Sequence, residues 1–243
     1  MPCQTVEISA LVLDFDGVVL ESAAIKTEAF IQMFEDYPEH RDAIVEYHLK
    51  NLGMSRFKKF SWIYRELLKK PLPRETLELL GARFSALVFE KILKAPFVPG
   101  AWEALEATRR TGLPVFVVSG TPHDELVKII ELRGLKDYFK DVWGSPMEKT
   151  AALRTIRSKF GLGSGEMLFV GDGYFDYEAA RTEGVPFLAR DSGDGSVDWS
   201  SCAVPKARDL TPVAELLQKG RVPLQAPGQP EATVFALKTR PPQ

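Results

Sequence analysis

Two aspartates, Asp14 and Asp16, come directly after a short apolar run in the segment Leu11–Gly17. At this spacing on an extended chain, both carboxylates lie on the same side. Carboxylates at close range raise each other's pKa, so burying the pair without a cation is costly. A Mg²⁺ ion removes this conflict because it binds carboxylate oxygens and waters in an octahedral shell. The alternative is a strand that ends in a turn, with the aspartates as turn formers.

A second polar group, Ser119 and Gly120, follows the apolar, β-branched run Val115–Val118. A hydroxyl and free backbone N–H groups after a strand form an anion-binding nest that suits phosphate oxygens. A helix pattern that starts at Asp124 places a helix N-terminus nearby, which also favours anions. The alternative is an ordinary turn.

Lys149 lies at the predicted start of a helix, in the segment Gly144–Thr150. A lysine there meets the positive end of the helix dipole, so its position needs a compensating partner. A cluster of carboxylates and a phosphate would supply that partner. The alternative is an exposed surface lysine.

The fourth group is Asp172 and Asp176, which follow the apolar run Leu168–Val170. If a helix begins near Gly173, Asp172 lies at the end of the strand and Asp176 lies in the first turn of the helix. Both carboxylates then face the same metal ion. The alternative is that Asp172 simply caps the helix.

Short apolar runs that alternate with helical patterns place these four groups. Such alternation indicates a parallel sheet with helices on both faces, so we expect an α/β fold with a doubly wound, Rossmann-like core. Ligands of these sheets bind outside the carboxyl ends of the strands, where all four groups fall. The expected strands are Ile8–Leu13, Val115–Val118, Met167–Val170 and Phe187–Ala189, and the expected helices are Ala101–Arg110, Asp124–Arg133, Thr150–Phe160 and Tyr177–Gly184.

Residues 20–96 have an almost wholly helical pattern that separates the first strand from the others. One helix is expected over residues 55–70 and the next over 74–94, divided by prolines. A helical insertion at this point is typical of a cap domain. We therefore expect a catalytic core of residues 1–19 and 97–215, a helical cap of residues 20–96, and a loosely attached C-terminal extension of residues 216–243, with Thr233–Leu237 as a candidate short edge strand.

The four motifs, in this order, resemble those of the haloacid dehalogenase-like superfamily, in particular its phosphoglycolate phosphatase and β-phosphoglucomutase type. The resemblance covers residues 8 to about 190, and the insertion resembles the α-helical cap of that family. Asp16 is informative, because the haloacid dehalogenases themselves lack the second aspartate. The resemblance therefore points to phosphate chemistry. Gly173 is a departure, since cap-bearing phosphatases of this type often have Ser there.

The resemblance implies a role for each motif residue. Asp14 would attack phosphorus to form an aspartyl phosphate, and Asp16 would act first as the acid and then as the base. The phosphoryl oxygens would be neutralised by Ser119, the Gly120 N–H and Lys149. The Mg²⁺ cofactor would be held by Asp14, the Asp16 backbone carbonyl and Asp172, with Asp176 as a further ligand or an acceptor behind the ligands.

Cationic residues of the predicted cap bear on the substrate. The run Gly53–Arg56 resembles a cap loop of the β-phosphoglucomutase branch, in which the arginine holds a second phosphate, and Lys26 stands where that branch has a histidine. We therefore expect Lys26 and Arg56 to contact a carboxylate or phosphate of the substrate. The alternative is two cations on a solvated helix face. Arg56, Lys58 and Lys59 also form a cluster that runs against the helix dipole, and a cationic edge facing the catalytic cleft would suit an acidic substrate. The alternative for Lys58-Lys59 is a solvated face, and His48 fits a packing residue.

The bulk composition excludes several classes of protein. A formal net charge of −2 over 243 residues disfavours a nucleic-acid partner, and no apolar stretch approaches the ~18–20 residues that span a bilayer. Cys3 and Cys202 have no metal-ligand spacing, and no signal peptide is evident, so we expect a cytoplasmic protein that is a monomer or a weak dimer.

Three functions compete for this sequence. The leading one is a Mg²⁺-dependent phosphatase that acts on a small phosphorylated metabolite, a sugar or sugar-acid phosphate. The second is a phosphomutase of the β-phosphoglucomutase type, and the third is a catalytically silent binding module. Cap closure is expected to accompany turnover, with hinges near Val19–Ser22 and Ala95–Pro99.

Overall fold

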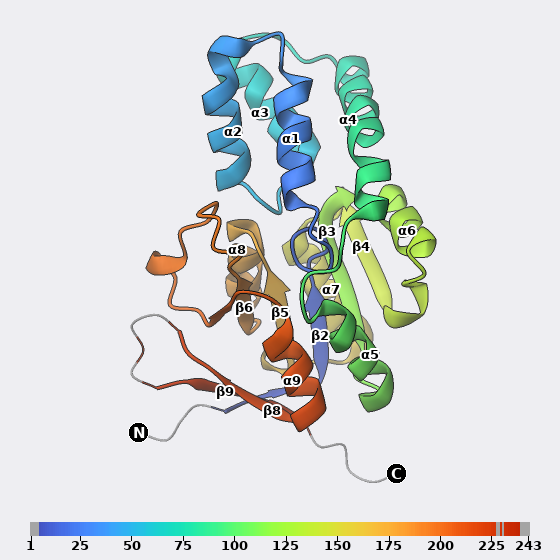
Figure 1. The fold of residues 1–243 in the computed structure, drawn as a ribbon, viewed down its shortest axis with the longest axis vertical. Helices are drawn as coiled ribbons and strands as arrows, with labels where there is room; N and C mark the ends of the chain where they lie inside the picture. Colours follow the sequence, from blue (N-terminus) through green and yellow to red (C-terminus); the bar gives the residue numbers. More distant parts are fainter. Residues whose placement is uncertain (1–4, 227–228, 230, 239–243) are drawn as a thin grey trace.

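A six-stranded parallel sheet forms the centre of the computed structural model, which describes residues 5–226, 229 and 231–238 (Figure 1). Its strand order is β4-β3-β2-β5-β6-β7, and every neighbouring pair is parallel. The strands are β2 (Ala10–Leu13), β3 (Val115–Pro122), β4 (Asp141–Ser145), β5 (Met167–Gly171), β6 (Phe187–Arg190) and β7 (Lys206–Ala207). The predicted α/β, doubly wound fold is thus confirmed.

Helices cover both faces of this sheet, as the alternation of side chains along a strand requires. Leu11 and Leu13 of β2 pack with α5 (Ala101–Thr111), α6 (His123–Leu132) and α9 (Thr211–Lys219) in one buried cluster. Ala10 and Val12 face the other way and pack with α7 (Lys149–Phe160) and α8 (Tyr174–Glu183). Strands β4 and β7 were not predicted, because one is a partly exposed edge strand and the other has only two residues.

A helical layer lies beyond the carboxyl ends of the strands, at the top of Figure 1. It contains α1 (Ala23–Met33), α2 (Arg41–Lys50), α3 (Arg56–Trp62) and α4 (Arg74–Lys94), with a short 3₁₀ turn at Pro38–His40. The helix expected over residues 55–70 ends early: Ile63–Leu67 is a π-helix, closed by a bond from Leu68 N–H to the Ile63 carbonyl (3.0 Å). Packed phenylalanine rings hold the layer together: Phe30, Phe34, Phe60 and Phe84.

Two adjacent chain segments connect the core to this helical layer. Leu20 and Phe97 pair in an antiparallel bridge, and the Glu21 N–H donates to the Pro96 carbonyl (2.9 Å). The two connecting segments are therefore hydrogen-bonded to each other, at the positions where hinges are expected. None of the helices in the described part of the chain is long and apolar enough to cross a membrane.

The C-terminal segment contradicts the expectation of loose attachment wherever the structure describes it. Strands β8 (Arg221–Leu224) and β9 (Thr233–Leu237) form a second sheet with β1 (Thr5–Ile8), in the order β1-β9-β8. Strand β9 is therefore the middle strand of this sheet, not an edge strand. Phe235 is only 2% exposed and belongs to the same buried cluster as α9, so apolar burial anchors the segment. The predicted boundary at residue 216 also falls inside α9.

The second sheet makes a measurable contribution to stability. Phe235→Ala removes a buried ring, which typically costs about 3–5 kcal/mol of unfolding free energy. Urea denaturation should show a loss in this range for Phe235→Ala. Arg221→Ala, at an exposed residue of β8, is the control and should change the free energy of unfolding by less than about 0.5 kcal/mol. Equal stability of the two variants would mean that the segment is loosely attached after all.

Candidate functional site

Three aspartates from two neighbouring strand ends meet above the central sheet. Asp14 follows β2, Asp172 follows β5, and Asp176 lies in the first turn of α8. All three are buried, and one carboxylate oxygen from each lies within 4.8 Å of the others. Because β2 and β5 are adjacent parallel strands, their carboxyl ends bring these side chains to one place. Such a group of oxygen ligands can hold a divalent cation.

Lys149 lies among these carboxylates, as its unfavourable position at the start of α7 suggested. Its Nζ donates to Asp14 Oδ2 at 2.9 Å and also to Asp176 Oδ1. Burial lowers the pKa of this lysine, but the two carboxylates outweigh burial and raise it. Lys149 is therefore charged, and with 8% exposure it is not the surface lysine of the alternative interpretation.

The remaining negative charge of the cluster is not balanced by Lys149 alone. Burial, together with Asp14 and Asp176, raises the pKa of Asp172 well above its usual value. Burial also raises the pKa of Asp176 to about 7, although Lys149 acts in the opposite direction. Three carboxylates around one ammonium thus leave an excess of acceptors in a site sheltered from water, which is what a divalent cation requires.

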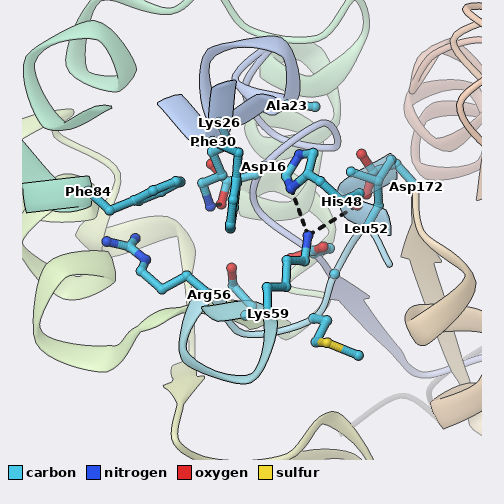
Figure 2. A pocket seen from close by; sticks show the side chains of 15 residues that line it. Asp16, Ala23, Lys26, Phe30, His48, Leu52, Arg56, Lys59, Phe84 and Asp172 are labelled. Carbon is cyan, nitrogen blue, oxygen red and sulfur yellow. Dashed lines mark hydrogen bonds and ion pairs between the residues drawn. The ribbon is translucent and has the colours of Figure 1, made fainter. Parts of the chain in front are cut away.

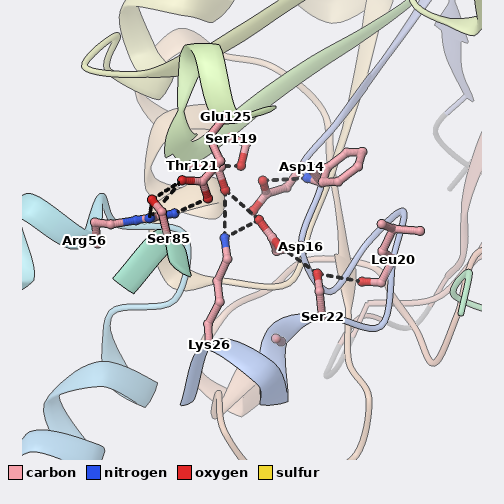
Figure 3. Close-up of polar contacts among 12 residues, drawn as sticks. Asp14, Asp16, Leu20, Ser22, Lys26, Arg56, Ser85, Ser119, Thr121 and Glu125 are labelled. Carbon is pink, nitrogen blue, oxygen red and sulfur yellow. Dashed lines mark hydrogen bonds and ion pairs between the residues drawn. The ribbon is translucent and has the colours of Figure 1, made fainter. Parts of the chain in front are cut away.

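Asp16 does not point into this cluster, contrary to the expectation that both aspartates of the first motif lie on one side. Its carboxylate accepts hydrogen bonds from Ser22 Oγ (2.6 Å), Thr121 Oγ1 (2.8 Å) and the Lys26 ammonium (Figure 3). The strand ends at Leu13, so the two aspartates are not on extended chain. The turn that follows places Asp16 beside Leu20 instead.

These partners set the charge of Asp16. Burial raises the pKa of its carboxyl, but Lys26 and the two hydroxyls together lower it below the usual value. Asp16 is thus held as a carboxylate. Ser22, just before α1, and Thr121, in β3, were not predicted from the sequence, because only the folded chain brings these two hydroxyls to Asp16.

Ser119 and Gly120 lie at the end of β3, where the nest was expected. Ser119 is buried, and its Oγ accepts from the Thr121 N–H at 3.2 Å. At Gly120, a Cβ would lie only 2.6 Å from the Gly53 carbonyl oxygen. A loop of the helical layer therefore touches the strand end, and only glycine leaves room for it.

The loop that contains Leu52 and Gly53 covers the acidic cluster. A Cβ at Gly173 would lie 2.4 Å from the Leu52 carbonyl oxygen, and a Cβ at Gly53 would lie 3.0 Å from Asp176 Oδ2. Gly53 also has a positive φ of 82°, which glycine adopts without strain. Glycine at position 173, where the resemblance suggested serine, thus allows the loop to approach the core. Ser55 continues the contact through a 2.9 Å hydrogen bond to Ser145.

Arg56 and Lys26 are both inside the structure and not on a solvated face. Arg56 is 4% exposed, and its guanidinium donates to both carboxylate oxygens of Glu125 (2.6 and 3.1 Å) and to Ser85 Oγ (2.8 Å). Glu125 lies in the first turn of α6, so this ion pair joins the helical layer to the core. No sequence pattern indicated Glu125, beyond its being a favourable acid at a helix start. Contact of either cation with substrate stays a prediction.

The polar groups border one cavity of about 50 Å³ between the helical layer and the sheet (Figure 2). Its size is enough for about three to five water molecules. His48, which was expected to be a packing residue, and Lys59, which belongs to the cationic edge expected at the cleft, also line it. Lys59 is 3% exposed, so the alternative of a solvated Lys58-Lys59 pair is wrong for this residue. The other lining residues used above are Asp14, Asp16, Lys26, Arg56, Ser119, Gly120 and Asp172.

Comparison with known proteins agrees with this geometry. The family model of haloacid dehalogenase-like hydrolases matches residues 8–184. The chain is 25% identical over 222 residues to a phosphoglycolate phosphatase of Yersinia pestis, covering 86% of this chain and 94% of the relative.

Solved structures share the fold at lower identity. A putative β-phosphoglucomutase from Bacteroides vulgatus superposes with a TM-score of 0.69 at 16% identity, over 88% of this chain and 90% of that chain. A predicted phosphoglycolate phosphatase from Haemophilus somnus gives a TM-score of 0.58 at 20% identity, over 75% and 84%. At these identities the two structures support the fold alone.

Replacing Asp172 by a neutral residue tests whether the acidic cluster holds more negative charge than Lys149 balances. Because its pKa is raised in the folded protein, the stability it contributes is present below its unfolded pKa of about 3.8 and is lost as the pH rises through the raised value. At pH 8 in EDTA, Asp172→Asn should therefore unfold about 2–8 °C above the unchanged protein, an increase of about 1–2 kcal/mol. Mg²⁺ should raise the Tm of the unchanged protein and much less that of the variant. Asp36→Asn, at an exposed carboxylate, is the control; a lower Tm for Asp172→Asn would contradict the charge excess.

Gly173→Ala tests the close approach of the loop. The backbone at Gly173 (φ −116°, ψ 154°) accepts alanine, so the only conflict is between the new Cβ and the Leu52 carbonyl. We expect a loss of about 1–3 kcal/mol in urea denaturation and a larger radius of gyration in solution scattering. Gly165→Ala, where a Cβ meets nothing within 4 Å, is the matched control. Identical scattering and stability for both variants would argue against the closed loop in solution.

Proposed function

The chain belongs to the haloacid dehalogenase-like hydrolase family, and on that premise we propose that it is a magnesium-dependent phosphatase acting on a small phosphorylated metabolite, a sugar or sugar-acid phosphate. The observation that carries the proposal is the buried Asp14 carboxylate, held by Lys149 and flanked by Asp172 and Asp176 at the carboxyl edge of the sheet.

Asp14 is placed to act as the nucleophile. Its Oδ1 accepts from the Phe15 N–H at 2.7 Å and its Oδ2 accepts from Lys149 at 2.9 Å, so the carboxylate is fixed in orientation. In the first step an Asp14 oxygen bonds to phosphorus, the bond from phosphorus to the ester oxygen breaks, and an aspartyl phosphate forms. In the second step water attacks this phosphorus, inorganic phosphate leaves, and the Asp14 carboxylate is restored.

Asp16 would move the protons of both steps. It gives a proton to the departing ester oxygen and then takes one from the attacking water. In the present arrangement Lys26, Ser22 and Thr121 hold it as a carboxylate, which is the form that accepts a proton. To act as the acid, the Asp16 carboxyl must lose its contact with the Lys26 ammonium and form one with the substrate's ester oxygen. Substrate entry beside Lys26 would thus trigger protonation of Asp16.

The other motif residues would bind and orient the phosphoryl group. Ser119, Gly120 and Lys149 line a second cavity, of about 230 Å³, which shares Ser119 and Gly120 with the first. Ser119, the Gly120 N–H and Lys149 would donate to the phosphoryl oxygens as the charge on these oxygens increases. Asp14, the Asp16 carbonyl, Asp172 and Asp176 would hold Mg²⁺. When bound, the ion supplies positive charge that stabilises the phosphoryl oxygens in the transition state.

The site favours a phosphatase over a phosphomutase. A mutase must grip a second phosphate, and Arg56, the residue that the resemblance assigns to this task, is already paired with Glu125. The cytoplasmic location and the monomeric or weakly dimeric state stay predictions.

The direct test is phosphate release from a panel of phosphorylated metabolites, with Mg²⁺ or with excess EDTA. We expect Mg²⁺-dependent release that falls by about 10⁴-fold or more in Asp14→Asn, since the nucleophile is lost. The exposed Asp36→Asn serves as the control and should retain the full rate. Hydrolysis that persists in Asp14→Asn, or that is indifferent to EDTA, would refute the mechanism.

A further inference from the structure

A buried lysine of α3, Lys59, reaches into the cavity from the helical layer (Figure 2). Its Nζ donates to His48 Nδ1 at 3.0 Å and to the His48 backbone carbonyl at 3.2 Å, and it lies 5.4 Å from the centre of the Phe30 ring. An ammonium group has three N–H donors, and these contacts use two of them. The third remains for a group in the cavity.

Lys59 differs from the other two cations that line the cavity. Lys26 is paired with the carboxylate of Asp16, and Arg56 is paired with that of Glu125. No carboxylate of the described residues lies within ion-pair distance of Lys59, whose acceptors are both neutral atoms of His48. A buried ammonium without an anion is costly, so this position needs an anionic partner that comes from elsewhere.

The hydrogen bonds around His48 fix it as an acceptor toward Lys59. Thr27 Oγ1 donates to the Ala23 carbonyl (3.3 Å), so it receives a hydrogen bond from His48 Nε2–H (3.1 Å). His48 Nδ1 then carries a lone pair that faces Lys59. Burial lowers the pKa of His48 to about 2, so the ring is neutral and does not repel the ammonium by its own charge. His48 thus holds the amine in place without neutralising it.

The electrostatic surroundings agree with an incomplete site. Burial, with Lys26 and Lys149 nearby, lowers the pKa of Lys59 well below its usual value, and Asp172 compensates only in part. An anion bound in the cavity would favour the charged form of the amine. The charged form of the Lys59 amine is therefore stabilised most when a negatively charged ligand is bound.

We propose that Lys59 is a specificity-determining residue that binds a second anionic group of the substrate, a carboxylate or a further phosphate, distinct from the phosphoryl group that reacts at Asp14. The inference rests on the proposed phosphatase function and deepens it, because it assigns the substrate a second negative charge. Asp14 and Lys59 line the same cavity, so this second charge would lie only a few bonds from the reacting phosphorus.

The test compares short substrates that differ only in the second group. Ethyl phosphate has none, phosphoglycolate has a carboxylate on the same two-carbon frame, and 1,2-ethanediol bisphosphate has a phosphate on that frame. The unchanged enzyme with Mg²⁺ should show a kcat/KM at least tenfold higher for one of the two anionic substrates than for ethyl phosphate. Whichever anionic substrate is preferred identifies the group that Lys59 receives.

Lys59→Met keeps the length of the side chain and removes its donors. For the preferred anionic substrate we expect KM to rise about 10- to 100-fold, the usual effect of one hydrogen bond to a charged group, with a much smaller change in kcat. For ethyl phosphate we expect a change in kcat/KM below about threefold. Lys50→Met, at an exposed lysine of α2, is the matched control and should leave all substrates unaffected.

Each contrary outcome has a distinct meaning. If the unchanged enzyme does not prefer either anionic substrate, the inference is overturned, even if Lys59→Met does not fold. An equal loss with all three substrates would assign Lys59 a structural role at the end of α2 and leave the phosphatase intact. If no substrate is hydrolysed in a Mg²⁺-dependent manner, the proposed function fails and the inference fails with it.

Discussion

The structure depends on the burial of three carboxylates around a single ammonium at one edge of the sheet. Asp14, Asp172 and Asp176 lie within 4.8 Å of one another, and Lys149 neutralises only part of their charge. Such a group is unfavourable in a folded chain unless a cation shares it. The parallel sheet makes it possible, since adjacent strands deliver their end residues to one place and the packed core prevents them from moving apart.

The helical layer completes the site by approaching the core with its backbone. Gly120 and Gly173 leave room for the carbonyl groups of Gly53 and Leu52, which lie where side chains would otherwise be. This approach excludes bulk water, and electrostatic interactions become stronger as the local dielectric constant falls. The ion pair between Arg56 and Glu125 also holds the helical layer against the core. The closed geometry thus strengthens the interactions of the charged cluster with a bound cation or phosphate.

Local sequence patterns predicted the parts of the fold and site that are contained in a few neighbouring residues. An apolar run followed by a polar residue located Asp14 and Asp172 at strand ends, and a lysine in an unfavourable place located Lys149 at a helix start, where the structure has them. The failures concern contacts between distant segments. Strand β9 pairs with β1 at the other end of the chain, and Asp16 is oriented by Thr121, 105 residues away. Neither partner can be inferred from the residues around it.

The cationic residues show why charge alone did not predict function. Lys26, Arg56 and Lys59 are all cations of the predicted cap, and all three line the same cavity. Their difference comes from what the fold places opposite each of them. Two face carboxylates of the core, so their charge is used within the protein to hold Asp16 and to join the two layers. The third faces only the neutral atoms of a histidine, and a charge left uncompensated inside a protein is the one that a ligand can satisfy.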